Sequence, residues 1–447
     1  MKDMTIQALS VKERSYRVLD SLSVGIGIKE NRYSLPPESI FSMAARNNPN
    51  RSYLFVSKLI GKHIPVCPPV PFIAGFLLAS RLAEALGLLI SKIKINEAVD
   101  ILSSDLNFDF QGISYSFPGR ALFIGFAETA TALGHSVFSS FTGDISFLHT
   151  TRENIKGTED TIYFTEEHCH APDQRCLIFD ASLMQDNDLL VLVDDEITSG
   201  NTCLNIIKTI QKKYPQKKYA VLTILDWRSE KAKEKYCKVE QELGIQIDVI
   251  SLLEGVFWSE GDSPFFNDPI TAISGNIPEV NMLHPEMRHG INTYFQSGEK
   301  YGYLGLTGRF GMGQSENHYL HIRAKEIGQK LSKIRKGKKS LCLGTGEFMY
   351  IPFLISRFMG EGIMVQSTTR SPVHPHLKEG YAVKHAITFY DPFRQDIKNF
   401  VYNIPPDYYD EVFVFWERKV LPEQVAPLVK SFEILGISNI SFVSFCN

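Results

Sequence analysis

The sequence has few cysteines, no excess of basic residues and no long apolar run, and each absence excludes a class of protein. Its seven cysteines are widely spread and form no C-x-x-C pair, so a disulfide framework is not expected. With 47 Lys and Arg against 50 Asp and Glu, the net charge is −3, which lacks the basic footprint of a dedicated nucleic-acid-binding protein. The segment His168-Cys169-His170 resembles a metal site, but successive residues cannot easily converge on one ion, which favours a polar loop.

The same reasoning argues against a membrane protein or an exported one. The longest apolar stretch, residues 66–80, contains three prolines and is shorter than the roughly 20 residues that a membrane span needs. The N-terminal residues are polar and contain no apolar segment of the signal-peptide kind. We therefore expect a cytoplasmic protein.

Strand-like and helix-like segments alternate through most of the 447 residues, which predicts an α/β protein of two or three domains. In the first half we expect strands over 52–59, 120–126, 144–149, 189–193 and 218–225, and helices over 72–89, 129–141 and 202–214. Residues 258–285 are rich in Gly, Pro, Asn and Ser, and we place the domain boundary there. The expected division is a first domain over 1–258, a linker over 259–284 and a second domain over 285–447.

The most informative segment is 189–202, in which an apolar run ends in two adjacent carboxylates, Asp194 and Asp195. Open α/β sheets bind ligands at the carboxyl ends of their strands, and carboxylates, which only accept hydrogen bonds, suit the vicinal hydroxyls of a ribose. A short polar loop then opens a helix, and its residues are Thr198, Ser199, Gly200, Asn201 and Thr202. Backbone N–H groups, hydroxyls and a helix N-terminus favour a dianionic phosphate, and Gly200 permits a tight turn. Helix capping, the alternative, needs only one such residue.

This segment contains neither a Walker loop nor a Rossmann glycine motif. It resembles the type I phosphoribosyltransferases, whose signature is an apolar strand, two acids and a T-x-G-x-T-like loop. The resemblance implies an orotate-phosphoribosyltransferase-like parallel sheet with flanking helices, 5-phosphoribosyl 1-diphosphate as a substrate, and Mg²⁺ as the cofactor. It also implies that Asp194 and Asp195 hold the ribose hydroxyls and, partly through substrate or water, the Mg²⁺. The 5-phosphate would lie on Thr198–Thr202.

An earlier strand end is the candidate for the diphosphate. Residues 122–134 read as a strand, a small-residue turn at Ala127, Glu128 and Thr129, and a helix. Plain strand–helix packing with a capping Thr is the alternative. Near another strand, Lys58, Lys62 and His63 flank a glycine, which is compatible with contact to a diphosphate or Mg²⁺-phosphate as well as with an ordinary surface.

The segment 150–173 is polar, charged and long for a loop inside a compact domain. In type I phosphoribosyltransferases a mobile loop at this place covers the reactive centre with basic residues. By that resemblance Arg152, Lys156 and His168 are candidates, with a solvated loop as the alternative. Farther on, Asp226 and Trp227 end a strand, where Trp227 could stack on an acceptor base or lie at a domain interface.

The second half repeats features of the first. Gly125 is followed after 152 − 125 = 27 residues by Arg152 of a Thr-Thr-Arg segment, and Gly344 after 370 − 344 = 26 residues by Arg370 of another. The run 411–416 stands where 190–195 stood, with Phe415, Trp416 and Glu417 at the place of Asp194 and Asp195, and no Thr/Ser/Gly loop follows it. The sequence therefore predicts a second α/β domain that is a degenerate copy of the first, although any two α/β domains can share such spacing.

The segment 369–372 reads Thr-Arg-Ser-Pro. It resembles the motif of a bacterial phosphoribosyltransferase family whose C-terminal TRSP domain is named after it, and which is associated with tellurite-resistance (Ter) stress gene clusters. The resemblance implies a role in making a nucleoside-like metabolite. Arg309, Glu347, Arg370 and Ser371 are candidates for an anion site in the second domain, and a structural role is the alternative for each.

Taken with the resemblance, the sequence predicts an enzyme that displaces diphosphate at the anomeric carbon of the ribose and attaches a small, base-like acceptor. Such a reaction needs positioning, Mg²⁺ and exclusion of water, and no covalent nucleophile, in agreement with the absence of a G-x-S-x-G motif. A non-catalytic sensor of phosphoribosyl diphosphate and an enzyme working in the reverse direction are the alternatives. The long polar segment favours an enzyme, because a sensor needs no lid. The acceptor and the oligomeric state, a homodimer included, stay open.

Overall fold

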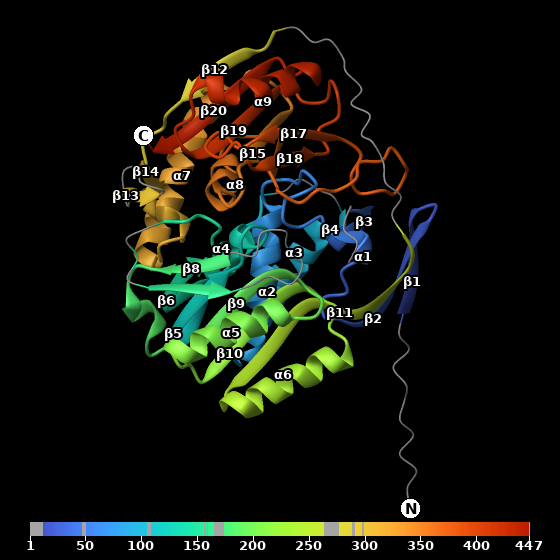
Figure 1. Cartoon of the computed structure of the whole chain (residues 1–447), viewed down its shortest axis with the longest axis vertical. Helices are drawn as coiled ribbons and strands as arrows, with labels where there is room; N and C mark the ends of the chain where they lie inside the picture. The colour runs from blue at the N-terminus through green and yellow to red at the C-terminus, as the bar shows by residue number, and fades with distance from the viewer. Residues whose placement is uncertain are drawn as a thin grey trace, which may run out of the picture.

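The computed structural model describes residues 12–46, 51–104, 109–155, 158, 160–164, 174–262, 277–287, 291–296 and 299–446. Two α/β units face each other, one around a seven-stranded sheet in the lower half of Figure 1 and one around a five-stranded sheet in the upper half. The predicted fold class is confirmed. None of the helices among these residues is long and apolar enough to cross a membrane.

The first sheet has the strand order β1-β2-β11-β10-β9-β5-β6. These strands are β1 (Lys12–Leu19), β2 (Leu22–Asn31), β11 (Gln246–Gly261), β10 (Lys218–Asp226), β9 (Leu189–Ile197), β5 (Tyr115–Gly125) and β6 (Phe141–His149). The five from β11 to β6 run parallel, and the β1–β2 hairpin adds antiparallel to β11. A parallel strand covered on both faces is apolar throughout rather than alternating, which is why the run Leu190–Val193 is completely buried.

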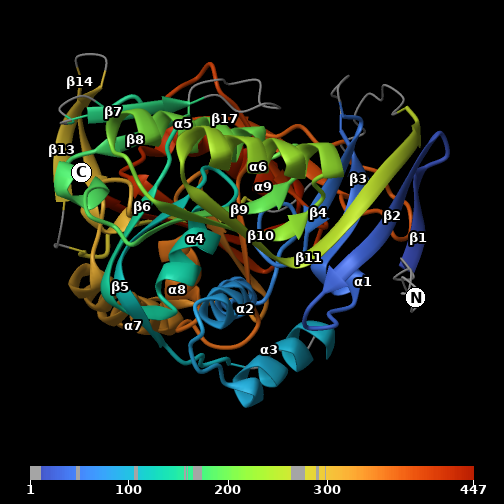
Figure 2. The same ribbon diagram turned by 90° about the horizontal axis from the view of Figure 1, so that it is seen from below.

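Helices cover both faces of this sheet, as Figure 2 shows from below. The helices α5 (Asn201–Lys213) and α6 (Glu230–Leu243) lie on one face, and α2 (Val70–Ala85) and α4 (Thr131–Phe138) on the other. Helix α3 (Lys92–Ser104) packs on α2. The smaller elements of this half are α1 (Pro37–Ile40), β3 (Phe41–Ala45) with β4 (Tyr53–Ser57), β7 (Asp160–Phe164) with β8 (Gln174–Ile178), and a 3-10 turn at Ala181–Met184.

The second sheet is parallel throughout, with the order β12-β20-β19-β15-β16. Its strands are β12 (Glu279–Leu283), β20 (Asn439–Cys446), β19 (Glu411–Arg418), β15 (Ser340–Gly344) and β16 (Ile363–Ser367). Around it lie α7 (Gln314–Ile334), α8 (Tyr350–Ser356), α9 (Pro422–Ile434), a 3-10 turn at Gly305–Thr307 and the hairpins β13 (Ile291–Gln296)–β14 (Glu299–Leu304) and β17 (Ala386–Tyr390)–β18 (Lys398–Tyr402). Strand β12 falls inside the expected linker, because its five residues stand in a segment rich in Gly, Pro, Asn and Ser. The division at 258 and 285 otherwise stays a prediction.

The two sheets share one topology. The order β11-β10-β9-β5-β6 in the first corresponds to β12-β20-β19-β15-β16 in the second. Gly125 ends β5 as Gly344 ends β15, and Arg152 follows β6 as Arg370 follows β16. The internal similarity seen in the sequence therefore joins equivalent elements. Only the edge strand differs in origin, since β12 precedes the rest of its sheet in the chain whereas β11 follows.

The two units meet through matched contacts. Backbone hydrogen bonds pair Phe147 of β6 with Met312 of the second unit (2.8 and 2.9 Å), and Val365 of β16 with Val66 of the first (2.8 and 3.0 Å). Between these pairs α4 packs against α8, and the ring of His135 stacks on Tyr350 with centroids 3.6 Å apart. Each unit thus adds backbone hydrogen bonds to the equivalent strand of the other.

Because backbone hydrogen bonds and buried rings join the units, we expect them to unfold together. Urea unfolding should give one transition, with the same midpoint for far-UV circular dichroism and for the fluorescence of Trp227 and Trp258 in the first unit and Trp416 in the second. Two separated transitions would contradict this coupling.

Candidate active site between the two domains

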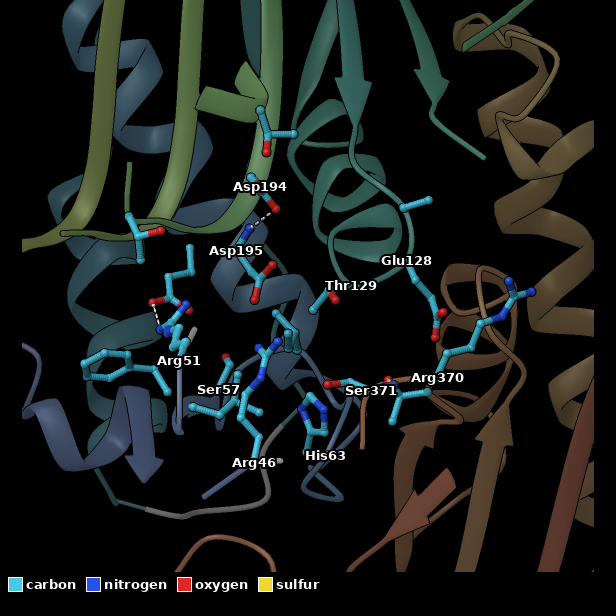
Figure 3. A pocket seen from close by; sticks show the side chains of 18 of the residues that line it. Arg46, Arg51, Ser57, His63, Glu128, Thr129, Asp194, Asp195, Arg370 and Ser371 are labelled. Atoms are coloured by element: carbon cyan, nitrogen blue, oxygen red, sulfur yellow. Dashed lines mark hydrogen bonds and ion pairs between the residues drawn. The ribbon is translucent and has the colours of Figure 1, made fainter. Parts of the chain in front are cut away.

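A cavity of about 570 Å³ opens at the carboxyl ends of β5, β6 and β9, where the second domain faces the first. From the first domain it is lined by residues within 46–63, 127–129 and 194–203, and by Arg152. From the second it is lined by residues 369–372 and by Arg394, Asp396 and Ile397. Figure 3 shows side chains from both domains turned toward one space.

The predicted acidic pair lies on the wall of this cavity (Figure 3). The backbone N–H of Asp195 donates to Oδ1 of Asp194 at 2.9 Å, within the last four residues of β9. Burial, and then the neighbouring charge of Glu196, raise the pKa of Asp195 to about 6. Glu196 is itself held by Arg51, with Nη2 and Oε1 2.5 Å apart.

The predicted phosphate loop forms the next part of the wall. Gly200 has a φ of +70° and precedes the first residue of α5, and a side chain there would collide with Tyr236, whose hydroxyl donates to the Gly200 carbonyl at 3.0 Å. The N–H groups of the first helical turn lack partners within the helix. Thr198, Ser199, Gly200 and Thr202 line the cavity. Asn201 does not, and its side chain accepts a hydrogen bond from Lys235.

The turn after β5 holds a buried carboxylate among cations. The Ala127 N–H donates to Thr150 Oγ1 at 2.7 Å, and Glu128 pairs with Lys62 at 2.7 Å and with Arg152 at 3.4 Å. Burial alone would raise the pKa of Glu128, but the charges of Lys62, Arg152 and Arg370 lower it to about 2. Three cations therefore act on one carboxylate beside the cavity.

The other candidates of the first domain lie elsewhere. Lys62 is buried behind Glu128 and also donates to the Gly346 carbonyl at 3.2 Å. His63 lines the cavity, whereas Lys58 lines neither this cavity nor the smaller one described below. Lys156 and His168, with the rest of the His-Cys-His segment, lie outside the described residues.

Neither interpretation of Trp227 holds. Its ring is buried inside the first domain among Phe41, Phe55 and Phe257, with the Phe55 ring stacked 4.9 Å away. Asp226 is likewise engaged, in an ion pair of 2.8 Å with Arg228. A sequence shows that a strand ends at Asp226 but does not show what packs against that end. In the structure Phe41 of β3 and Phe55 of β4 pack against Trp227. Phe55 lines the cavity instead.

The four candidates of the second domain separate into two pairs. Arg370 and Ser371 line the large cavity, whereas Arg309 and Glu347 line an adjoining one of about 60 Å³. Arg309 holds Glu417 through two contacts of 2.9 Å. Glu347 accepts hydrogen bonds at 2.6 Å from the Arg152 N–H and from the hydroxyl of Thr151. These contacts favour a structural role for Arg309 and Glu347 over an anion site.

Three arginines of the cavity wall, Arg46, Arg51 and Arg394, were not singled out from the sequence. Arg51 reaches Glu196 across 145 residues of chain, and Arg394 comes from the other domain. No motif marks them, and only the folded chain brings them to the cavity.

The acidic pair fits a magnesium ion of the kind that is shared with a substrate. Mg²⁺ prefers oxygen ligands, keeps several waters, and is usually held by one or two carboxylates together with substrate phosphates. Asp194 and Asp195 supply such oxygens. Among the described residues no group of three or more His, Cys, Asp or Glu is placed to hold a metal without a substrate.

The raised pKa of Asp195 implies that its charge destabilises the fold. A carboxyl whose pKa is higher in the folded state costs stability as pH rises from its ordinary pKa to the raised one, and the whole cost is present at pH 7. We expect Asp195→Asn to raise the free energy of unfolding at pH 7 by about 1 to 3 kcal/mol, and to leave it unchanged below pH 4.

Urea titrations at pH 7 and pH 3.5 measure this difference. Asp248→Asn, on the exposed side of β11, is the matched control and should change stability little at either pH. A loss of stability in Asp195→Asn at pH 7 would contradict the conclusion that the Asp195 charge is disfavoured by burial and by Glu196.

Comparison with known proteins places both halves of the chain. The family model described as "Phosphoribosyl transferase" matches residues 40–256, and the model described as "TRSP domain C terminus to PRTase_2" matches residues 306–432. No curated protein matches.

Two solved structures are similar to parts of the chain. An adenine phosphoribosyl transferase from Trypanosoma brucei is 11% identical, with 51% of this chain and 82% of that one covered and a TM-score of 0.30. An APRTase from Giardia lamblia is 17% identical, with 31% and 70% covered and a TM-score of 0.23. At these TM-scores the two structures add nothing to the assignment, which follows from the two family models. The chain belongs to the phosphoribosyltransferases that carry a C-terminal TRSP domain.

Proposed function

We propose that the chain transfers the phosphoribosyl group of 5-phosphoribosyl 1-diphosphate to a small, base-like acceptor and releases diphosphate. The observation that carries this proposal is that the acidic pair, the phosphate loop and the turn after β5 open into one cavity. Each of the three matches one part of the substrate. A stress-linked pathway with a nucleoside-like product stays a prediction from the sequence.

The loop at the start of α5 suits the 5-phosphate. The hydroxyl-bearing residues Thr198, Ser199 and Thr202 line the cavity, and the positive end of a 13-residue helix begins directly after Gly200. Asp194 and Asp195, which precede this loop in β9 and line the same cavity, are placed to accept hydrogen bonds from the two ribose hydroxyls. A phosphate and a ribose bound in this way leave the anomeric carbon inside the cavity.

The turn Ala127–Thr129 suits the diphosphate. Lys62 and Arg152 lie beside it, and their joint charge exceeds that of Glu128. Mg²⁺, held by the substrate with Asp194 and Asp195, would neutralise the leaving group. Arg152 and, by resemblance, Lys156 are the basic groups that we assign to the closing loop.

In the reaction the bond between the anomeric carbon and the diphosphate oxygen breaks, and a bond to the acceptor atom forms. Positive charge develops on the ribose in between, so the residues of the cavity act by orienting both reactants and excluding water. The second domain forms the opposite wall and thus limits access of water.

Diphosphate release tests the proposal. The full chain is incubated with 5-phosphoribosyl 1-diphosphate, Mg²⁺ and fractions of a small-molecule cell extract, and diphosphate is measured. Release that depends on one fraction supports the enzyme and isolates the acceptor. Binding of 5-phosphoribosyl 1-diphosphate without turnover in any fraction would favour a sensor.

We expect the double variant Asp194→Asn, Asp195→Asn to bind 5-phosphoribosyl 1-diphosphate at least about 100-fold more weakly, because two charge-assisted sets of hydrogen bonds are lost. Isothermal titration calorimetry with Mg²⁺ present measures the affinity. The control is again Asp248→Asn, which removes a carboxylate far from the cavity. Unchanged affinity of the double variant would refute the assigned ribose site.

A further inference from the structure

The second domain forms part of the wall of the cavity in which we place the reaction. Thr369, Arg370, Ser371 and Pro372 line it, and so do Arg394, Asp396 and Ile397. Ser371 of the TRSP motif lies across this cavity from the acidic pair, and the Arg370 side chain runs past Glu128 on the side away from that pair (Figure 3).

The two domains match residue by residue at their junction. The His149 N–H donates to the Gly308 carbonyl of the second domain at 3.2 Å, and the equivalent Ser367 N–H donates to Gly61 of the first at 2.8 Å. Within each domain the corresponding turns also match, because the Ala127 N–H donates to Thr150 Oγ1 at 2.7 Å. In the second domain, the Gly346 N–H donates to Thr368 Oγ1 at 2.9 Å. The domains are related as two copies facing each other.

The second copy has lost its own substrate site. Gly125 pairs with Val193 in register, and Leu343, one residue before Gly344, pairs with Val414. Counting on along β9 and β19, Trp416 occupies the position of Asp194, and Glu417 that of Asp195. Arg309 neutralises Glu417, and the remaining cavity of about 60 Å³ is too small for a phosphoribosyl group.

One cation of the lost site has remained available. Arg370 is the counterpart of Arg152, lies where the two cavities adjoin, and lines both. Its side chain extends beside the Glu128 carboxylate (Figure 3). Within the described part of the chain the Arg370 guanidinium makes no hydrogen bond or ion pair, whereas Lys62 and Arg152 are both engaged with Glu128.

The second domain also fixes the opposite cation. Glu347 accepts the backbone N–H of Arg152 and the hydroxyl of Thr151, both at 2.6 Å. The start of the segment that we assign to the closing loop is therefore held by a carboxylate from the other half of the chain. Glu347 is a positioning residue in this arrangement, because it acts through Arg152.

We propose that Arg370 is a substrate-binding residue of the first-domain site, supplied by the TRSP domain to hold the diphosphate of 5-phosphoribosyl 1-diphosphate from the wall opposite the turn after β5. This inference rests on the proposed function. A guanidinium binds phosphate oxygens through two parallel N–H bonds, so a free arginine beside the diphosphate turn is suited to that group. The TRSP domain then has a function although its own site is closed.

The test compares two ligands that differ in the diphosphate. Calorimetry measures the affinity of the full chain for 5-phosphoribosyl 1-diphosphate with Mg²⁺ and for ribose 5-phosphate. We expect Arg370→Gln to weaken the first about 10- to 100-fold and to leave the second within about twofold. Arg370→Lys, which retains the charge without the planar fork, should recover part of the affinity and serves if the Gln variant fails to fold.

Arg323→Gln, on the outer helix α7, controls for the loss of an arginine elsewhere in the same domain. Equal affinities of the wild-type chain and Arg370→Gln for 5-phosphoribosyl 1-diphosphate would overturn the inference while leaving the proposed function intact. So would an equal weakening of both ligands, which would indicate a general disturbance of the cavity. A wild-type chain that does not bind 5-phosphoribosyl 1-diphosphate at all would overturn the proposed function itself.

Discussion

The buried carboxylate of Glu128 is the point on which the arrangement of the two domains depends. A charge taken out of water must be paired, and removing one partner of such a pair is costly. Lys62 meets Glu128 and at the same time donates to the carbonyl of Gly346 in the other domain. Glu128 is thus paired within the first domain, by Lys62 and Arg152, and the second domain holds both cations through the Gly346 carbonyl and the Glu347 carboxylate.

These contacts join the two domains beside the cavity that residues of both domains line. The ends of β5 and β9 supply the groups that we propose for the sugar and its phosphates, and residues 369–372 of the second domain line the same cavity. This segment of the second domain follows β16, as the segment that contains Arg152 follows β6 in the first domain. The second domain, whose own cavity is only about 60 Å³, thus contributes part of the lining of the larger cavity.

The sequence was most informative where structure and chemistry are local. The segment Leu189–Thr202 could be interpreted without the fold, because a buried parallel strand is apolar throughout and a helix start needs polar groups in succession. The spacing from Gly344 to Arg370 likewise marked a strand, a helix and a second strand in the right order. Both depend on residues that are neighbours in the chain.

The sequence was least informative where contacts are distant. Nothing near Glu196 points to Arg51, and nothing near Arg152 points to Glu347, 195 residues away. Trp227 was misjudged for the same reason, since the hairpin that buries its ring is formed by residues far earlier in the chain. The β1–β2 hairpin was not expected, and part of the supposed polar loop after β6 forms β7, which pairs with β8.

The origin of β12 has a consequence for how the chain can be divided. This strand follows the first domain in the chain and pairs with the outer edge of β20 in the second sheet. An uncovered parallel edge exposes a row of backbone donors and acceptors and invites pairing with other chains. The second sheet therefore includes the chain from Glu279 onward, and a fragment that begins after Leu283 would expose the paired edge of β20 to solvent.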